Sequence, residues 1–343
     1  MDRGKLSLLS CKSGSEFYKK VVIELKKIAE HSIDTPNMLE EYFPNGEVKI
    51  EILNNIRGND IYIFQNIDDP NSDRNINDNF FAILNTIDAV RFADADSITA
   101  VLPQYPYARQ ERRKEREGIT AKLVARQLEE VGVDRVITLD LHAASVQGFF
   151  PKAKLENLHA SGIFIDHFKS LESKNIINKN NTVVVAPDMG STERARYYSN
   201  QLGYDIAVID KARNYSKAST IKSMKLLGDV KDKNLIIIDD MISTGGTLLR
   251  AISTLKEFGA KDIYIATSLP FFNGDAIKNF SDAYKEGKFK SIIGTDAVFW
   301  GEKFINEHEW YDEISIAPLF AEVIYRINHK QSVSELLNYK KRG

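Results

Sequence analysis

Residues 234–251 read NLIIIDDMISTGGTLLRA, and this stretch decides the fold class. Its apolar run, 235–238, leads to two adjacent carboxylates, and a turn rich in Ser, Thr and Gly then opens an amphipathic stretch that ends at Gly259. A short β-branched run followed by a turn and a helical repeat is typical of a strand–turn–helix unit of an α/β protein. The stretch therefore predicts a buried strand, a tight turn and a helix, in that order.

The turn of this unit predicts a binding site for an anion. It consists of Ser243, Thr244, Gly245, Gly246 and Thr247. At a helix N-terminus the unpaired N–H groups and the helix dipole attract an anion, and glycine lets the backbone approach it closely. The carboxylates of Asp239 and Asp240, one step back at the sheet edge, are placed for the hydroxyls of a sugar. An ordinary capped junction is the alternative, but it would leave these carboxylates unpaired at a strand end.

The same pattern recurs along the chain. Further β-branched runs stand at 61–64, 98–102, 135–139, 182–186, 206–209 and 263–266. Helical periodicity fills intervals between them, as in the apolar series that begins at Phe80 and the series that begins at Leu123. Near-continuous apolar strands that alternate with helices predict a mostly parallel sheet covered on both faces.

A weak internal sequence similarity suggests two α/β halves. The stretch 83–105 resembles 251–272 in its order of helix, small-residue turn, strand, proline and aromatic residues. A length of 343 residues suits two domains, since domains usually span about 100–200 residues. We therefore expect an N-terminal domain over 1–150, a C-terminal domain over 151–313, and a helix and tail over 314–343 that pack back on the body.

Composition excludes several classes of function. The 46 Lys and Arg residues nearly balance the 48 Asp and Glu residues, for a formal charge of -2, so no nucleic-acid or membrane partner is expected. Cys11 is the single cysteine, which rules out an internal disulfide and fits a reducing compartment. No apolar run of about 18 residues appears, and residues 1–11 are too mixed for a secretory signal. We expect a soluble, cytoplasmic protein.

The unit at 234–251 resembles a known motif. Residues 239–247 are similar to the phosphoribosyl-binding motif that type I phosphoribosyltransferases share with ribose-phosphate diphosphokinases, the PRPP synthetases. The motif alone does not choose between the two families, but the longer stretch 42–337 resembles the diphosphokinases, and ISTGGT at 242–247 resembles a divergent, archaeal-type branch. The resemblance implies two tandem type I phosphoribosyltransferase-like domains, each a mostly parallel sheet flanked by helices.

The resemblance also implies a Mg2+ site. Residues 135–150, RVITLDLHAASVQGFF, end a predicted strand just before His142 and resemble the diphosphokinases' DLHA…QGFF. In that family the matching histidine helps to bind Mg2+, and Asp188 in VVVAPDMG resembles the second residue of the metal site. Mg2+ keeps waters and phosphate oxygens in its coordination shell, so a sparse pair of protein ligands is chemically sufficient.

Residues 107–122, YARQERRKEREGITAK, resemble the family's ATP-binding segment and flap. The resemblance implies that Arg109 and Gln110 contact ATP and that Arg116 lies on a mobile flap over the reaction centre. Gly118 stands where the family usually has proline, which bears on the stiffness of the flap.

Residues 42–52, YFPNGEVKIEI, resemble the family's FxDGE motif, which reaches the adenine of ATP across a subunit interface. The matching residues are Phe43, Asn45, Gly46 and Glu47. Phe43 can stack on a base and Glu47 can accept a hydrogen bond from an exocyclic amine, while Asn45 replaces the usual Asp. A plain hairpin turn is the alternative. The resemblance implies a homo-oligomer.

IDKARN at 209–214 resembles the family's DKxR, which carries a catalytic lysine and a sugar-phosphate arginine. Lys211 and Arg213 inherit these roles by the resemblance, and two surface cations are the alternative.

Taken together, the resemblance implies an enzyme that transfers the diphosphate of ATP to the C1 hydroxyl of ribose 5-phosphate, with Mg2+, to give PRPP and AMP. Two other functions stay open: a phosphoribosyltransferase, and a non-catalytic regulatory subunit derived from the same family. Ser268 and Leu269, which stand where the family usually has Thr-His, favour the latter. The intact His142, Asp188 and Lys211 favour the enzyme.

Overall fold

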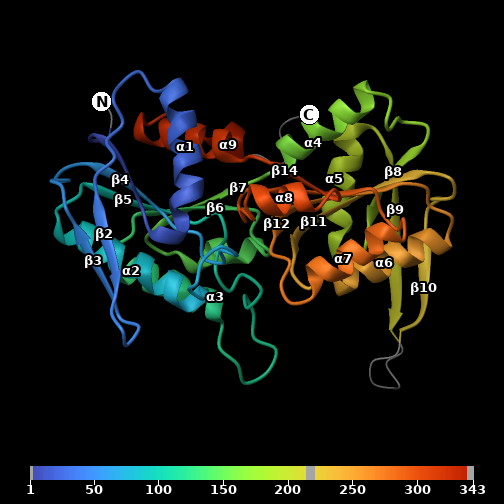
Figure 1. The fold of residues 1–343 in the computed structure, drawn as a ribbon, viewed down its shortest axis with the longest axis horizontal. Coiled ribbons are helices and arrows are strands. Elements are labelled where there is room, and N and C mark those ends of the chain that lie inside the picture. The colour runs from blue at the N-terminus through green and yellow to red at the C-terminus, as the bar shows by residue number, and fades with distance from the viewer. Residues whose placement is uncertain (1–2, 214–220, 338–343) are drawn as a thin grey trace. The chain divides into compact units, whose positions relative to one another are not determined.

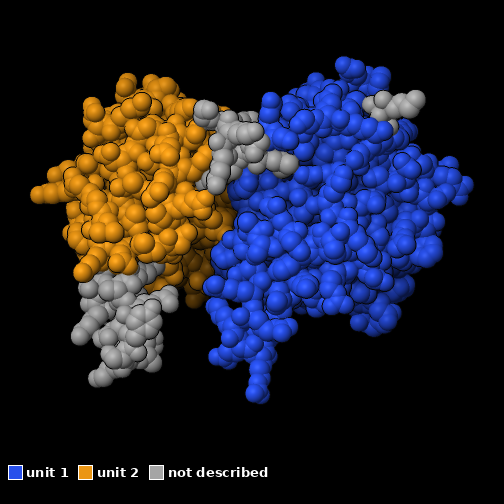
Figure 2. All heavy atoms as spheres, turned by 180° about the vertical axis from the view of Figure 1, so that it is seen from behind, with its two compact units in different colours: residues 1–159, 296–300, 315–342 blue, residues 160–295, 301–314, 343 orange. Residues whose placement is uncertain are grey.

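The computed structural model describes residues 3–213 and 221–337, apart from the side chains of residues 211–213, 221–224 and 337. These residues form two compact units (Figure 2). Unit 1 holds the described parts of 1–159, 296–300 and 315–342, and unit 2 holds those of 160–295 and 301–314. Each unit is built around its own sheet, which Figure 1 shows.

Unit 1 contains, within its described residues, a five-stranded sheet whose neighbouring strands all pair in parallel. Its order is β1 (Leu6–Ser10), β4 (Asp60–Phe64), β5 (Ser97–Val101), β6 (Arg135–Leu139) and β7 (Lys154–Leu158). Successive side chains alternate across a strand, so Ile61 and Ile63 face one side of the sheet while Tyr62 and Phe64 face the other. All of them are fully buried, so both faces of β4 are covered.

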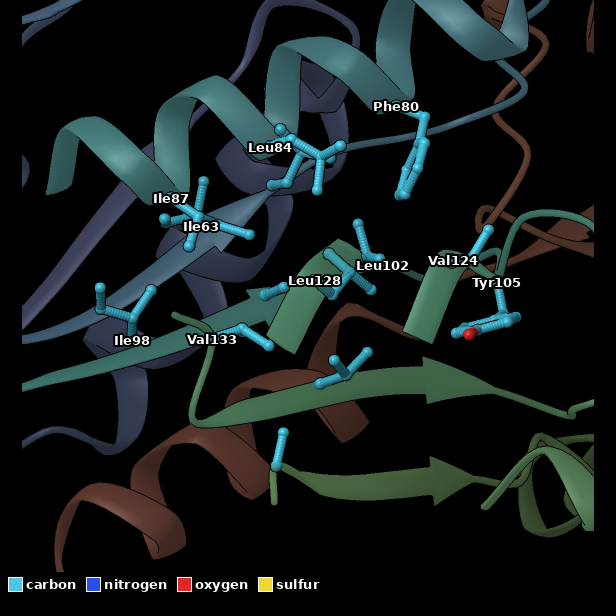
Figure 3. Close-up of a cluster of buried hydrophobic side chains, with 14 of the residues drawn as sticks. Ile63, Phe80, Leu84, Ile87, Ile98, Leu102, Tyr105, Val124, Leu128 and Val133 are labelled. Atoms are coloured by element: carbon cyan, nitrogen blue, oxygen red, sulfur yellow. The ribbon is translucent and has the colours of Figure 1, made fainter. Parts of the chain in front are cut away.

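The helices of unit 1 lie on both faces of this sheet. They are α1 (Ser15–Ile28), α2 (Ile76–Phe92), α3 (Thr120–Glu130), α9 (Ala317–Asn328) and α10 (Ser334–Leu337). The core between α2, α3 and the sheet includes Ile63, Leu84 and Leu128 (Figure 3). On the opposite face α1 and α9 lie side by side, where Phe17 of α1 contacts both Phe64 and Phe320 (Figure 1). An antiparallel hairpin, β2 (Met38–Tyr42) and β3 (Val48–Ile52), packs through β3 on α2.

The contact between α1 and α9 predicts a large loss of stability in Phe320→Ala. Phe320 is fully buried, and its ring meets that of Phe17 edge-on at a centroid distance of 5.1 Å. Removing a buried phenylalanine ring costs about 3–5 kcal/mol of the free energy of unfolding. Urea denaturation measures this loss, with Phe92→Ala as control, since Phe92 is 84% exposed. An equal shift in both variants would mean that α9 does not stabilise unit 1.

Unit 2 contains, over the part of it that the structure describes, a seven-stranded sheet that is parallel except at its edge strand β10. Its order is β10 (Ile221–Leu227), β9 (Asp205–Arg213), β8 (Thr182–Ala186), β11 (Asn234–Ile242), β12 (Ile263–Pro270), β13 (Ser291–Thr295) and β14 (Tyr311–Ile314). Its helices are α4 (Ser161–Ser173), α5 (Thr192–Leu202), α6 (Gly246–Glu257), α7 (Ala276–Lys285) and α8 (Glu302–Glu307). Figure 1 shows α4 and α5 on one face of this sheet and α6 and α7 on the other.

The expected fold class, mostly parallel sheets flanked by helices, is confirmed. The described residues 315–337, which fall in the expected C-terminal tail, belong to unit 1, where α9 packs against α1 and α10 contacts β7. None of the described helices is both long enough and apolar enough to cross a membrane.

Candidate active site

The expected anion loop lies in unit 2 at the carboxyl end of β11, and α6 begins at Gly246. Ser243 donates a hydrogen bond to Oδ1 of Asn273 (2.8 Å), which fixes the start of the loop. The hydroxyl of Thr244 is exposed and makes no hydrogen bond within the described chain. The first N–H groups of a helix have no partner within it, so the loop and the start of α6 present free donors to an anion.

The glycines of the loop serve different purposes. Gly245 has φ +71°, a left-handed conformation, and a Cβ there would lie 2.4 Å from Cε2 of the buried Phe280. Gly245 is therefore required by the fold itself. A Cβ on Gly246 would meet nothing closer than Nη1 of Arg250 at 3.7 Å, so this position stands open to an approaching ligand.

Asp239 and Asp240 share a cation that the sequence did not suggest. Nη1 of Arg194, on α5, lies 3.1 Å from Oδ1 of Asp239 and 3.2 Å from Oδ1 of Asp240. The premise that these carboxylates would stand unpaired without a ligand is therefore wrong, because a residue far away in the sequence pairs with both. The strand also continues past them to Ile242, rather than ending at the carboxylates.

The environment of this pair changes the acidity of Asp239. Burial is the main reason that the pKa of Asp239 is raised to about 7, and the neighbouring Asp240 raises it further. The charge of Arg194 opposes both effects. A carboxyl group with this pKa changes its charge near neutral pH.

Asp188 and Lys211 belong to the same sheet. Asp188 follows β8, which pairs in parallel with both β11 and β9, so it lies at the carboxyl edge of the sheet. Its Oδ1 accepts the N–H of Ser191 (3.0 Å), and its Oδ2 accepts no hydrogen bond in the described part of the chain. The backbones of Lys211 and Arg213 lie within β9, because this strand continues past the predicted run 206–209, and their side chains are outside the described atoms.

The remaining predicted residues lie in unit 1. His142 follows the carboxyl end of β6 and is exposed. Oδ1 of the nearby Asp140 accepts a hydrogen bond from Nδ1 of His159 (2.7 Å), a pair that sequence reasoning missed. No three His, Cys, Asp or Glu side chains gather into a possible metal cluster within the described residues. A Mg2+ site built on His142 and Asp188 stays a prediction, since these residues belong to different units.

The segment after β5 holds the expected ATP residues on an irregular loop. Gln110 is tied to the start of α3, because its Oε1 accepts the hydroxyl of Thr120 (2.6 Å). Arg109 is exposed, and so is Arg116, which makes no ion pair with any described residue. The exposure of Arg116 leaves its guanidinium available to a phosphate.

The hairpin β2–β3 has the turn that the plain-hairpin interpretation expects. Gly46 has φ +90°, and the N–H of Glu47 is accepted by Oδ1 of Asn45 (3.2 Å). An amide oxygen is sufficient for this bond, so replacement of the family's Asp by Asn45 preserves the turn. Phe43 lies at the tip and is 44% exposed, which leaves its ring free of the core.

Comparisons with known proteins agree with this arrangement. Residues 6–132 match the family model for the N-terminal domain of ribose phosphate pyrophosphokinase, and residues 152–302 match that for the phosphoribosyl transferase domain. A ribose-phosphate pyrophosphokinase of Helicobacter pylori is 40% identical over 86% of this chain and 86% of its own. Ribose-phosphate pyrophosphokinase 1 of Streptococcus agalactiae is 36% identical over 99% of both chains. The crystal structure of phosphoribosylpyrophosphate synthetase from Mycobacterium smegmatis superposes with a TM-score of 0.82 at 30% identity, covering 95% of this chain and 99% of that one.

Proposed function

Since the chain belongs to the ribose-phosphate pyrophosphokinase family, we propose that it transfers the β,γ-diphosphate of ATP to the C1 hydroxyl of ribose 5-phosphate. In this reaction the C1 oxygen bonds to the β-phosphorus, and the bond between that phosphorus and the oxygen of the α-phosphate breaks. The products are 5-phosphoribosyl 1-diphosphate and AMP. The single cysteine and the absence of a membrane-crossing helix among the described residues support a cytoplasmic enzyme.

The observation that carries this proposal is the loop in front of α6 beside the carboxylates of β11. The loop, 243–247, would hold the 5-phosphate through backbone N–H groups, because the helix N-terminus favours an anion. Asp239 and Asp240 would accept the ribose hydroxyls, and Arg194 would hold both carboxylates in place. Arg213, from β9, would add a cation for the sugar phosphate.

We assign Mg2+ to His142 and Asp188. Asp188 fits such an ion, because one carboxylate oxygen already caps a turn and the other accepts no hydrogen bond from the described residues. Mg2+ usually keeps several waters and phosphate oxygens, so one or two protein ligands suffice. When bound, the ion supplies positive charge that offsets the charge of the phosphates.

ATP would contact two segments of unit 1. The residues are Phe43, Asn45, Gly46, Glu47, Arg109 and Gln110. The exposed ring of Phe43 supports stacking on a base, and the exposed Arg109 supports a phosphate contact. We propose that Phe43 reaches the ATP site of a second copy of the chain, since its position at a hairpin tip suits such a contact.

Charge develops on the transferring phosphate groups in the transition state, and preorganised cations stabilise it. Lys211 and Arg116 would supply this charge from within the chain, with Arg213 at the sugar phosphate. The loop that carries Arg116 would exclude water when substrates are bound, which favours transfer to the sugar over hydrolysis.

The test of the function is release of AMP from ATP that depends on both ribose 5-phosphate and Mg2+. The proposal expects AMP and 5-phosphoribosyl 1-diphosphate in equal amounts. A phosphoribosyltransferase would instead consume 5-phosphoribosyl 1-diphosphate only with a nucleobase, and a non-catalytic regulatory subunit would release no AMP. Either outcome would overturn the proposal.

The raised pKa of Asp239 predicts a pH dependence of sugar binding. With a pKa of about 7, its ionised fraction falls from about nine-tenths at pH 8 to about one-tenth at pH 6. Protonation weakens a carboxylate as an acceptor for hydroxyls, so kcat/KM for ribose 5-phosphate should fall about tenfold over this range. The control is Asp239→Asn, which keeps the titration of the substrate phosphate but removes that of Asp239. Parallel profiles in the two proteins would exclude Asp239 as the titrating group.

The proposed contact of Phe43 with a second copy predicts an oligomer. Sedimentation at micromolar concentration should show an assembly, and Phe43→Ser should raise the KM for ATP without changing that for ribose 5-phosphate. A fully active monomer would contradict the shared site.

A further inference from the structure

Unit 1 carries a pocket at the amino-terminal edge of its sheet, which we call the basal pocket. Its volume is about 530 Å³, and it is lined by the cations Arg3, Arg135, Lys152, Lys154 and Lys330. Arg135 is the first residue of β6 and Lys154 the first residue of β7. The predicted residues Arg109, Gln110 and His142 follow the carboxyl ends of β5 and β6, so the basal pocket lies at the opposite edge of the same sheet.

The charges of the basal pocket are not balanced within the protein. Its carboxylates are Asp96 and Asp134, and Glu156 pairs with Arg135. The other cations of the pocket form no ion pair with any residue that the structure describes. With the buried Asp60, which lies beside Ser97 and Arg3, five cations thus meet four carboxylates, in a chain whose formal charge is -2. Like charges held together at a pocket repel one another, and an anion would relieve this repulsion.

Arg135 gives an independent sign of a missing ligand. Its side chain is almost fully buried, with a relative exposure of 5%, and Nη1 pairs with Glu156. Its Nε is also buried and has no acceptor among the described residues. A buried, charged N–H without an acceptor is costly, and native structures rarely leave one unsatisfied. Arg135 lines the pocket, so an anion bound there would lie beside this side chain and offset its charge.

The lining indicates what kind of anion fits. Apart from Gly4, every residue around the basal pocket is charged or is Ser97, and none is aromatic. A nucleobase would find no ring to stack on, whereas arginine and lysine side chains suit phosphate oxygens. A second cavity of about 340 Å³ shares Asp134 and Lys152 with it and adds Arg91 and Glu129, so the charged surface extends beyond the length of one phosphate group.

We propose that the basal pocket is a binding site for a compact anion with at least two phosphate groups, of which inorganic diphosphate is the simplest. The anion is held by Arg135 at the bottom of the pocket and by Lys152 and Lys154 at its rim. This site is separate from the proposed sugar-phosphate loop, which belongs to unit 2, and it does not depend on the proposed activity.

The experiment is calorimetric titration of the full-length protein with inorganic diphosphate and, separately, with inorganic phosphate. The test variant is Lys152→Gln combined with Lys154→Gln, because both side chains are exposed and form no described ion pair, so the fold is kept. The control is Lys26→Gln, an exposed lysine on α1 that also forms no described ion pair. All three proteins keep the loop 243–247 of unit 2, so any binding of diphosphate at that loop is the same in each of them.

We expect one diphosphate-binding event of the wild-type protein to weaken at least about tenfold in the double variant and to persist in Lys26→Gln. Inorganic phosphate should bind this site more weakly than diphosphate. The signal of the Nε–H of Arg135, assigned by its absence from Arg135→Lys, should shift on diphosphate addition. Identical isotherms in the wild-type and double-variant proteins, or equal losses in the control, would overturn the proposal.

Discussion

Lys211→Ala is expected to lower kcat at least about a hundredfold while leaving the fold intact, the scale on which loss of one electrostatic stabiliser acts. The backbone of Lys211 lies in the last part of β9, beside the strand that leads into Asp188. A cation at this edge of the sheet would offset charge on the transferring diphosphate, which a neutral methyl group cannot do. Turnover at saturating substrate concentrations measures the effect, and circular dichroism reports on the fold.

The matched control is Lys225→Ala. Lys225 is an exposed lysine of β10 and pairs in register with Asp210, so it belongs to the same antiparallel ribbon as Lys211. Its loss should change kcat less than about twofold, as is usual for an isolated surface charge. Near-normal turnover in Lys211→Ala, or an equal loss in the control, would remove Lys211 from the mechanism.

The sequence was most informative where local patterns and tertiary packing agree. The run at 235–238, the turn and the repeat that follows predicted β11 and α6, because a strand buried on both faces has to be apolar throughout. The strand nevertheless continues to Ile242, since Met241 and Ile242 pair with Leu269 and Pro270 of β12. Two adjacent aspartates suggest a strand end locally, but pairing with a neighbouring strand decides where the strand stops.

Contacts between residues that lie far apart in the sequence could not be predicted from the sequence. Arg194 reaches Asp239 and Asp240 from α5, and neither spacing nor composition points to it, because only the packing of α5 beside β11 brings them together. The C-terminal helix was expected to pack back on the body, but no pattern in the sequence pointed to α1 as the partner of α9. The strand β10 was not predicted, because charged residues interrupt its apolar pattern and it pairs only at the sheet edge.

Binding of the sugar phosphate by the loop 243–247 can be tested by substitution at a single position, Gly246. The sequence predicts the same role for Gly245 and Gly246, but the two glycines have different surroundings in the structure. A side chain at Gly245 would collide with the ring of Phe280 and occupy a left-handed conformation, so Gly245→Val would damage the fold and say little about binding. Gly246 begins α6 in open space, so a substitution there leaves the packing unchanged.

Gly246→Val is therefore expected to raise the KM for ribose 5-phosphate at least about tenfold and the KM for ATP less than about twofold. The branched side chain would stand where the backbone N–H groups meet the phosphate, and losing one hydrogen bond to a charged group costs about 1.5–3 kcal/mol. Gly246→Ala, with a smaller side chain, should give a smaller change in the same direction. Asp239→Asn should also weaken sugar binding, through loss of charge rather than through steric exclusion. The ratio of the two KM changes decides the assignment: if both KM values rose equally in a folded Gly246→Val protein, the loop would not be the specific site of the sugar phosphate.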